Sequence, residues 1–391
     1  MSNITFSMVK IGVLWMNTES EENNEKIEEQ SPNESQIKSF LKWFTLKNIS
    51  IFLLMTVVYF IVFELFVRIL PYNPGSARMV MSFINHEWTD SHTYVTDLDL
   101  FWRFRPNQEI ECHTKDDEFY KIPINNIGFQ GGDFPDSVPD NAFRIMFLGD
   151  SCVFGWEVPP EKNIPNQVMN NAKKAYPHQI FHTFNGGTPG YSSYQAKTVL
   201  RLFGKQYNPH LVIVYVGTGD ALPKINNTDL EIAHGLRKNL LLGEIIDKSK
   251  LLSTLRAFFY YLNRQMSDNS DTIDWSKALP RVSFDEYKSN MTDMINFSRN
   301  EIQSEIVLVT RQHNTPIASV FKYNKILRKL AQEKNVLYVE VEKLISNQQN
   351  PTSLYVENDE IHMNEEGSEL VGEYIFKCID DEGIFLKKKK M

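Results

Sequence analysis

The stretch RIMFLGDS, residues 144–151, decides the fold. Its apolar part has the length of one strand, and its unbroken hydrophobicity is typical of a strand that is covered on both faces of a sheet. Gly-Asp-Ser follows directly and predicts a tight turn into a helix that begins near Ser151. A buried strand that leads into a helix in this way favours an α/β arrangement.

The segments downstream alternate in the same manner. We expect helices at 165–174, 192–207, 284–300, 323–333 and 366–378, and strands at 179–185, 211–217, 306–310 and 336–341. This alternation predicts an α/β fold, a three-layer doubly wound parallel sheet, whose ligands bind at the carboxyl ends of the strands. We place this domain at 143–382. Within it lies an insertion at about 222–280, whose aromatic stripe is either packing or a lid over the site.

Three segments of different composition precede this domain. Residues 1–45 contain an acidic, polar run with too little apolar surface to order, and they predict a disordered tail. Residues 49–70, ISIFLLMTVVYFIVFELFVRIL, are long enough for a transmembrane helix. A buried globular helix or a re-entrant segment is the alternative, because the charge-free part ends at Phe63. Residues 71–142 hold short extended pieces between turn residues and predict a β-rich lead-in.

The charges beside the apolar segment predict its orientation. Lys38, Lys42 and Lys47 closely precede it. Soon after it the chain has a single basic residue, Arg78. The positive-inside rule therefore predicts a single-pass membrane protein with a cytoplasmic N-terminus and an extracytoplasmic α/β domain.

Composition excludes several classes of protein. The 41 basic and 49 acidic side chains give a net charge of −8, which disfavours binding to nucleic acid through phosphate neutralisation. A mean hydropathy of −0.34 excludes a protein with many membrane spans. The three cysteines stand at wide spacings that match neither a disulfide framework nor a zinc site. We expect no nucleic-acid partner, no metal and no cofactor.

Two motifs carry groups that suit acyl transfer. Ser151, at a strand-to-helix turn, would point its hydroxyl out of the sheet, although a serine there could simply cap the helix. Asp359 stands three residues before His362, and a carboxylate in that place can fix the histidine tautomer. The alternative is a solvated loop in which Asp359 or Asn364 caps the last helix.

Together these motifs resemble the SGNH hydrolases, also called the GDSL esterase and lipase family, over residues 144–378. The resemblance implies a flavodoxin-like sheet and a catalytic triad. Ser151 matches the nucleophile position, His362 the general base, and Asp359 the carboxylate that orients it. The implied activity is that of a membrane-tethered serine esterase or O-acyl (acetyl) transferase, which acts outside the cytoplasm on an ester-bearing substrate such as an acylated glycan or lipid.

The oxyanion-binding blocks of the family are matched only in part. Asn185 followed by Gly190 matches the second block, so the resemblance implies that the N–H groups of Gly190 and Ser151 bind the oxyanion. The third block reads Gly-x-Asn-Asp in the family, but Gly219 replaces the asparagine here, and it is the third candidate for the oxyanion hole. Loss of one donor lowers turnover by ~10²–10³. The chain is then a slow enzyme, an enzyme whose missing donor comes from elsewhere, or an inactive scaffold that binds glycan or an envelope partner.

Two further residues near these motifs have plain interpretations. We expect Cys152 to be a small buried residue rather than a reactive thiol, because its side chain should point away from the site. We expect His313, which follows the fourth strand of the predicted sheet, to be a surface loop histidine.

Overall fold

The computed structural model describes residues 45–69, 93–113, 119–134, 138–224, 228–238, 249–252, 254–255 and 279–387. The chain divides into two compact units, Met1–Phe63 and Glu64–Met391. The predicted tail, apart from residue 45, lies outside the described residues, as does most of the insertion with its aromatic stripe.

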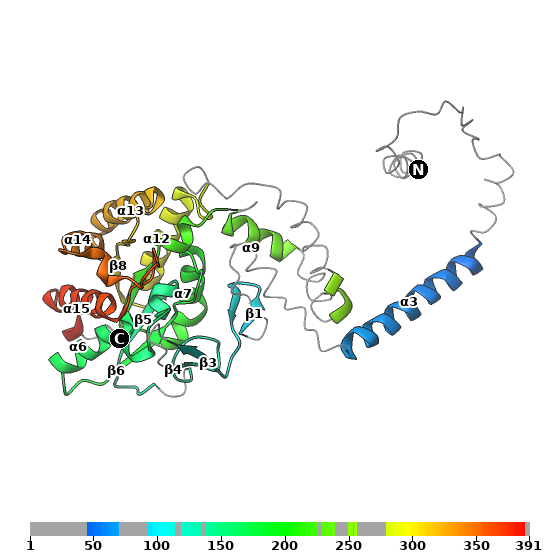
Figure 1. The fold of residues 1–391 in the computed structure, drawn as a ribbon, viewed down its shortest axis with the longest axis horizontal. Coiled ribbons are helices and arrows are strands. Elements are labelled where there is room, and N and C mark those ends of the chain that lie inside the picture. The colour runs from blue at the N-terminus through cyan, green and yellow to red at the C-terminus, as the bar shows by residue number, and fades with distance from the viewer. Residues whose placement is uncertain are drawn as a thin grey trace, which may run out of the picture. The chain divides into compact units, whose positions relative to one another are not determined.

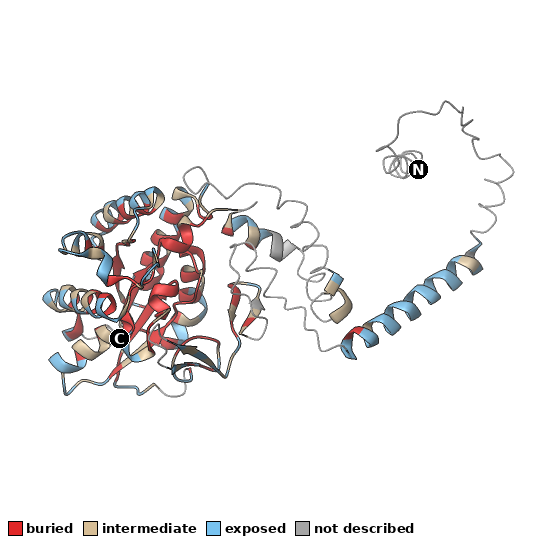
Figure 2. Ribbon diagram, viewed as in Figure 1, coloured by how far each residue is buried: buried red, intermediate tan, exposed pale blue. Residues whose placement is uncertain are grey.

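Helix α3 (Leu46–Ile69) covers the predicted apolar segment. The most apolar 18-residue window within Lys47–Ile69 has a mean hydropathy of 2.5, and none of that window is buried, as the exposed ribbon in Figure 2 shows. Glu64 and Arg68 form an ion pair of 2.7 Å across one turn. Among the described residues, this is the one helix that is long and apolar enough to cross a membrane.

The lead-in contains two antiparallel hairpins that pack against the α/β domain. Its strands are β1 (Tyr94–Asp97) with β2 (Phe101–Phe104), and β3 (Gln108–His113) with β4 (Phe119–Ile124). Trp102, Phe104 and Ile122 are buried in the same apolar cluster as one face of the main sheet. Gln130 bridges Ile124 of the second hairpin and Asn185 of the sheet. The lead-in and the sheet therefore share one core.

The main sheet has five parallel strands in the order β6-β5-β7-β8-β9. They are β5 (Phe143–Gly149), β6 (Phe181–Asn185), β7 (Leu211–Tyr215), β8 (Glu305–Val309) and β9 (Leu337–Val339). In sequence order this is 2-1-3-4-5, the flavodoxin-like arrangement. The predicted α/β class and its doubly wound parallel sheet are confirmed.

Helices cover both faces of this sheet (Figure 1). One face carries α7 (Ser193–Tyr207), α12 (Phe284–Asn296) and α13 (Ala318–Lys334), and the other carries α6 (Ile164–Ala175), α14 (Val341–Ser346) and α15 (Glu365–Asp381). A π-helical turn, Phe297–Glu301, continues α12, and short 3₁₀ turns lie at Pro160–Lys162, Pro351–Leu354 and Ile384–Leu386.

The unbroken apolar strands have a direct structural cause. In β5, Met146 and Leu148 join the core on the α7 face, whereas Ile145 and Phe147 join the core on the α15 face. Side chains of a strand alternate between the faces, so a strand covered on both sides needs apolar residues at every position. Polar groups therefore lie mainly in the loops that follow the carboxyl ends of these strands.

Candidate active site

The turn after β5 presents Ser151 at the carboxyl edge of the sheet. Ser151 begins the short helix α5 (Ser151–Phe154), and the carboxylate of Asp150 caps that helix by accepting the Cys152 N–H at 3.0 Å. Because Asp150 caps the helix, the alternative in which Ser151 does so does not hold. The Ser151 hydroxyl lies instead 2.8 Å from Nε2 of His362.

The loop before α15 aligns His362 with this serine. Nδ1 of His362 lies 2.7 Å from Oδ2 of Asp359, whose Oδ1 accepts the N–H groups of Ile361 and His362 at 2.6 and 2.8 Å. Asn364 caps α15 by accepting the Gly367 N–H, so Asp359 is not needed as a helix cap. The structure thus brings the three residues Ser151, His362 and Asp359 into one hydrogen-bonded chain.

The environment of Asp359 favours its charged form. Partial burial raises the pKa of this carboxyl, but the hydrogen bonds from the His362 side chain and from the two backbone N–H groups outweigh burial and lower the pKa to about 2. A permanently charged carboxylate at Nδ1 keeps the proton of a neutral imidazole on that nitrogen. Nε2, which lies 2.8 Å from the Ser151 hydroxyl, can then accept the proton of that hydroxyl.

Acid stability is expected to depend on Asp359. Its folded pKa lies below the ordinary value of about 3.9, so its stabilising contribution is complete above about pH 4 and is lost as the pH falls toward 2. The shift corresponds to roughly 2 kcal/mol. Asp359→Asn should lower the free energy of unfolding near pH 6 and flatten its fall between about pH 4 and 2, as measured by urea unfolding at each pH. Asp140→Asn, at an exposed site, is the control; parallel pH profiles for wild type and Asp359→Asn would contradict this expectation.

Arg311 contacts the buried side of the turn that carries Ser151. This fully buried guanidinium lies 3.5 Å from Asp150, stacks over the Tyr215 ring at 4.2 Å, and donates through Nε to the Thr218 hydroxyl at 3.0 Å. It also contacts Sγ of Cys152, which is 7% exposed and whose pKa burial raises to about 12. The prediction that Cys152 is a small buried residue is confirmed, although its Sγ lies 3.5 Å from the carbonyl oxygen of Ile361, in the loop that carries His362.

The expectation that His313 lies on the surface is wrong. Its side chain is 2% exposed, and its Nε2 lies 2.8 Å from the Thr218 hydroxyl, at the carboxyl edge of the sheet. Burial, together with the positive charge of Arg311, lowers the pKa of His313 to about 3, so this histidine is neutral. The signal available in the sequence was its position directly after a central strand, where polar residues gather in this fold.

Gly190 lies in the loop after β6, where a backbone N–H can face the serine. Its φ of +78° belongs to the left-handed region that favours glycine. Within the described part of the chain, the N–H groups of Gly190 and Ser151 donate to no other residue. Both remain available for an external acceptor.

Gly219 lies in the short helix α8 (Thr218–Ala221) after β7, and the structure explains why no asparagine stands there. A Cβ atom at this position would lie 1.9 Å from the carbonyl oxygen of Tyr191 and 3.1 Å from the nitrogen of Ser192. The backbone that follows Gly190 therefore fills the space into which a side chain at 219 would begin. Gly219 itself brings no side-chain donor to the site.

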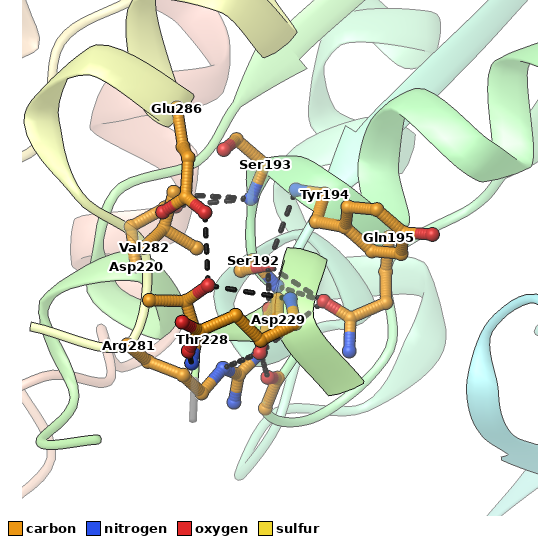
Figure 3. A network of polar contacts seen from close by, with 12 residues as sticks. Ser192, Ser193, Tyr194, Gln195, Asp220, Thr228, Asp229, Arg281, Val282 and Glu286 are labelled. Carbon is orange, nitrogen blue, oxygen red and sulfur yellow. Dashed lines mark hydrogen bonds and ion pairs between the residues drawn. The ribbon is translucent and has the colours of Figure 1, made fainter. Parts of the chain in front are cut away.

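A buried polar network contacts Ser192 and Ser193, which directly follow the loop that carries Gly190 (Figure 3). The carboxylate of Asp220 accepts the Ser193 N–H at 3.0 Å, and burial raises the pKa of Asp220 to about 7. Asp229, at the start of α9 (Asp229–Lys238), accepts the Ser192 hydroxyl and pairs with Arg281 at 2.8 Å. Sequence reasoning missed Asp229 and Arg281, which come from opposite ends of the insertion.

The described residues contain no group of three or more His, Cys, Asp or Glu side chains that could hold a metal ion.

Comparisons with known proteins match the chain to one family. Residues 147–370 match the model of a family described as the GDSL-like lipase/acylhydrolase family. Among solved structures, a lipase/acylhydrolase from Enterococcus faecalis is 16% identical, with 63% of this chain and 98% of that chain covered at a TM-score of 0.41. An acetylxylan esterase from Geobacillus stearothermophilus is 14% identical, with 60% and 93% covered at a TM-score of 0.39. No curated protein matches the chain.

Proposed function

Because this chain belongs to the GDSL-like lipase/acylhydrolase family of ester-hydrolysing enzymes, we propose that it is a membrane-tethered serine esterase with Ser151, His362 and Asp359 as its catalytic triad. One observation carries the proposal. Two consecutive short contacts, 2.8 Å from Ser151 Oγ to His362 Nε2 and 2.7 Å from His362 Nδ1 to Asp359 Oδ2, link nucleophile, base and orienting carboxylate.

The mechanism follows from this geometry. As Ser151 Oγ attacks the ester carbonyl, its proton moves to Nε2 of His362, and Asp359 stabilises the imidazolium that forms. The carbonyl oxygen becomes an oxyanion and is bound by the N–H groups of Ser151 and Gly190. When the tetrahedral intermediate collapses, the C–O bond to the alcohol breaks and His362 returns the proton to the leaving oxygen. Water, activated by the same base, then cleaves the acyl-enzyme and restores Ser151.

The same acyl-enzyme can pass its acyl group to a sugar hydroxyl instead of water. The reaction of an O-acyltransferase differs only in that second step, because the alcohol takes the place of water at the carbonyl. We place the substrate among acyl esters of glycans or lipids that lie outside the cytoplasm.

An aryl acetate assay of the full chain in detergent tests the proposal. We expect release of the phenol and of acetate above the uncatalysed rate, and loss of that activity after treatment with a phosphonate that reacts with catalytic serines. Addition of a sugar alcohol distinguishes hydrolysis of the acyl-enzyme from transfer of its acyl group, because a transferase would form the acetylated sugar at the expense of free acetate. A rate no higher than that of buffer, with no reaction of the phosphonate, would overturn the proposal.

Tethering through α3 is the second part of the proposal. The helix has the length of a bilayer span, and its described apolar side chains other than Val67 are exposed rather than packed in a core. The lysines that precede it favour a cytoplasmic N-terminus and hence an external catalytic domain.

Topology can be measured directly in cells. A reporter enzyme that is active only outside the cytoplasm, fused after residue 80, should be active. In a matched fusion with Lys38, Lys42 and Lys47 replaced by glutamine, the external signal should fall, because the charge bias that retains the N-terminus is removed. An inactive reporter in the unaltered fusion would contradict the proposed orientation.

A further inference from the structure

Trp102 links the lead-in to the loop that carries Gly190. It lies in β2, outside the residues that match the family model, and its side chain is 1% exposed. Its indole Nε1 donates a hydrogen bond to the carbonyl oxygen of Pro189 at 3.1 Å. The hydroxyl of Tyr191 returns a bond to the Trp102 carbonyl at 2.6 Å, and the two rings meet edge to face at 5.6 Å.

The carbonyl that Trp102 binds belongs to a particular peptide group. The C=O of Pro189 and the N–H of Gly190 share one planar peptide, and in the trans form they point in opposite directions. A donor that holds the oxygen therefore also fixes the direction of the N–H. It polarises the same peptide as well, because hydrogen bonds in a chain strengthen one another.

The next peptide is held from the other side. Nη2 of Arg281 donates to the carbonyl oxygen of Gly190 at 2.9 Å, and the guanidinium lies over the Trp102 ring at 5.8 Å. Arg281 is itself paired with the buried Asp229. The peptides on both sides of the Gly190 Cα atom are thus anchored by buried side chains from outside the loop.

The absence of a side-chain donor at Gly219 raises the importance of this anchoring. With two backbone donors instead of two donors and an asparagine amide, the oxyanion depends more strongly on the exact direction of the Gly190 N–H.

We propose that Trp102 is a positioning residue for catalysis, whose indole N–H orients and polarises the Pro189–Gly190 peptide so that its N–H faces the developing oxyanion. The inference rests on the proposed function. It makes the first hairpin of the lead-in a working part of the active site, although the hairpin lies outside the family match.

Trp102→Phe tests the inference, because it removes the donor and keeps an aromatic ring. For the full chain with an aryl acetate, we expect kcat to fall on the order of ten- to a hundredfold with KM within about twofold of wild type, less than the loss of a whole oxyanion donor. Tyr207→Phe is the matched control: it removes another buried aromatic donor to a backbone carbonyl, that of His182 at 3.0 Å. It should lower Tm but keep kcat within about twofold.

A second variant keeps the test decisive when the phenylalanine variant does not fold. Site-specific replacement of Trp102 by 3-benzothienylalanine keeps the fused ring and substitutes sulfur for the N–H, and it should show the same loss in kcat. An unchanged kcat in a folded variant, while wild type remains active and reacts with the phosphonate, would overturn the role of Trp102 alone. A wild type that is inactive and unlabelled would instead overturn the proposed function, and this inference with it.

Discussion

Replacement of Ser151 by alanine is expected to lower kcat for an aryl acetate by about 10⁴-fold or more while the fold stays intact. In the proposed mechanism this hydroxyl forms the acyl-enzyme, and the side chain is small and 8% exposed, so alanine fits in its place. The loss consists of one hydrogen bond to His362. Turnover and Tm of the full chain, measured side by side, check this expectation.

The double variant sharpens the same prediction. Groups that act as one unit are not additive, so Ser151→Ala with His362→Ala should be about as slow as either single variant. If Ser151→Ala keeps a tenth or more of the wild-type kcat, Ser151 is not the nucleophile.

Gly219→Asn is expected to impair the protein, although it restores the residue of the family motif. Its Cβ would lie 1.9 Å from the Tyr191 carbonyl oxygen, and the contact is with backbone, so the loop that carries Gly190 must move. Overpacking of this kind typically costs roughly 1–3 kcal/mol. We expect a lower Tm together with a kcat reduced by about tenfold or more, since the Gly190 N–H is displaced.

The control for this variant is the same substitution at an open site. Gly132 has nothing within 4 Å of a Cβ atom, so Gly132→Asn should leave both Tm and kcat close to wild type. A rise in kcat of Gly219→Asn at an unchanged Tm would show that the loop yields and that the side-chain amide completes the oxyanion hole.

The α/β domain could be predicted well because its strands are buried on both faces. Five apolar runs such as 144–150 and 211–217 needed no partner information to be recognised, and the order of the motifs indicated the edge at which they meet. The end of the sheet was harder: the run 336–341 was expected to be one strand, but β9 stops at Val339 and α14 begins at Val341. Val341 is fully buried in the helix, so it carries the same apolar signal as a strand residue.

The supporting contacts of the site could not be predicted because they join distant segments. Trp102, Asp229 and Arg281 meet around the Gly190 loop only after the lead-in and the ends of the insertion have folded against it. Each is an ordinary aromatic or charged residue in its own sequence context. His313 was misjudged for a related reason, because a loop at the carboxyl edge of a sheet is buried when neighbouring loops close over it.

Reaction of the full chain with a serine-reactive phosphonate, followed by peptide mass spectrometry, tests the central claim most directly. One phosphonyl adduct should form on Ser151 at the rate at which esterase activity is lost, and His362→Ala should slow its formation strongly because the base is missing. An adduct on a different residue, or full loss of activity without an adduct on Ser151, would contradict the assignment of Ser151 as the nucleophile.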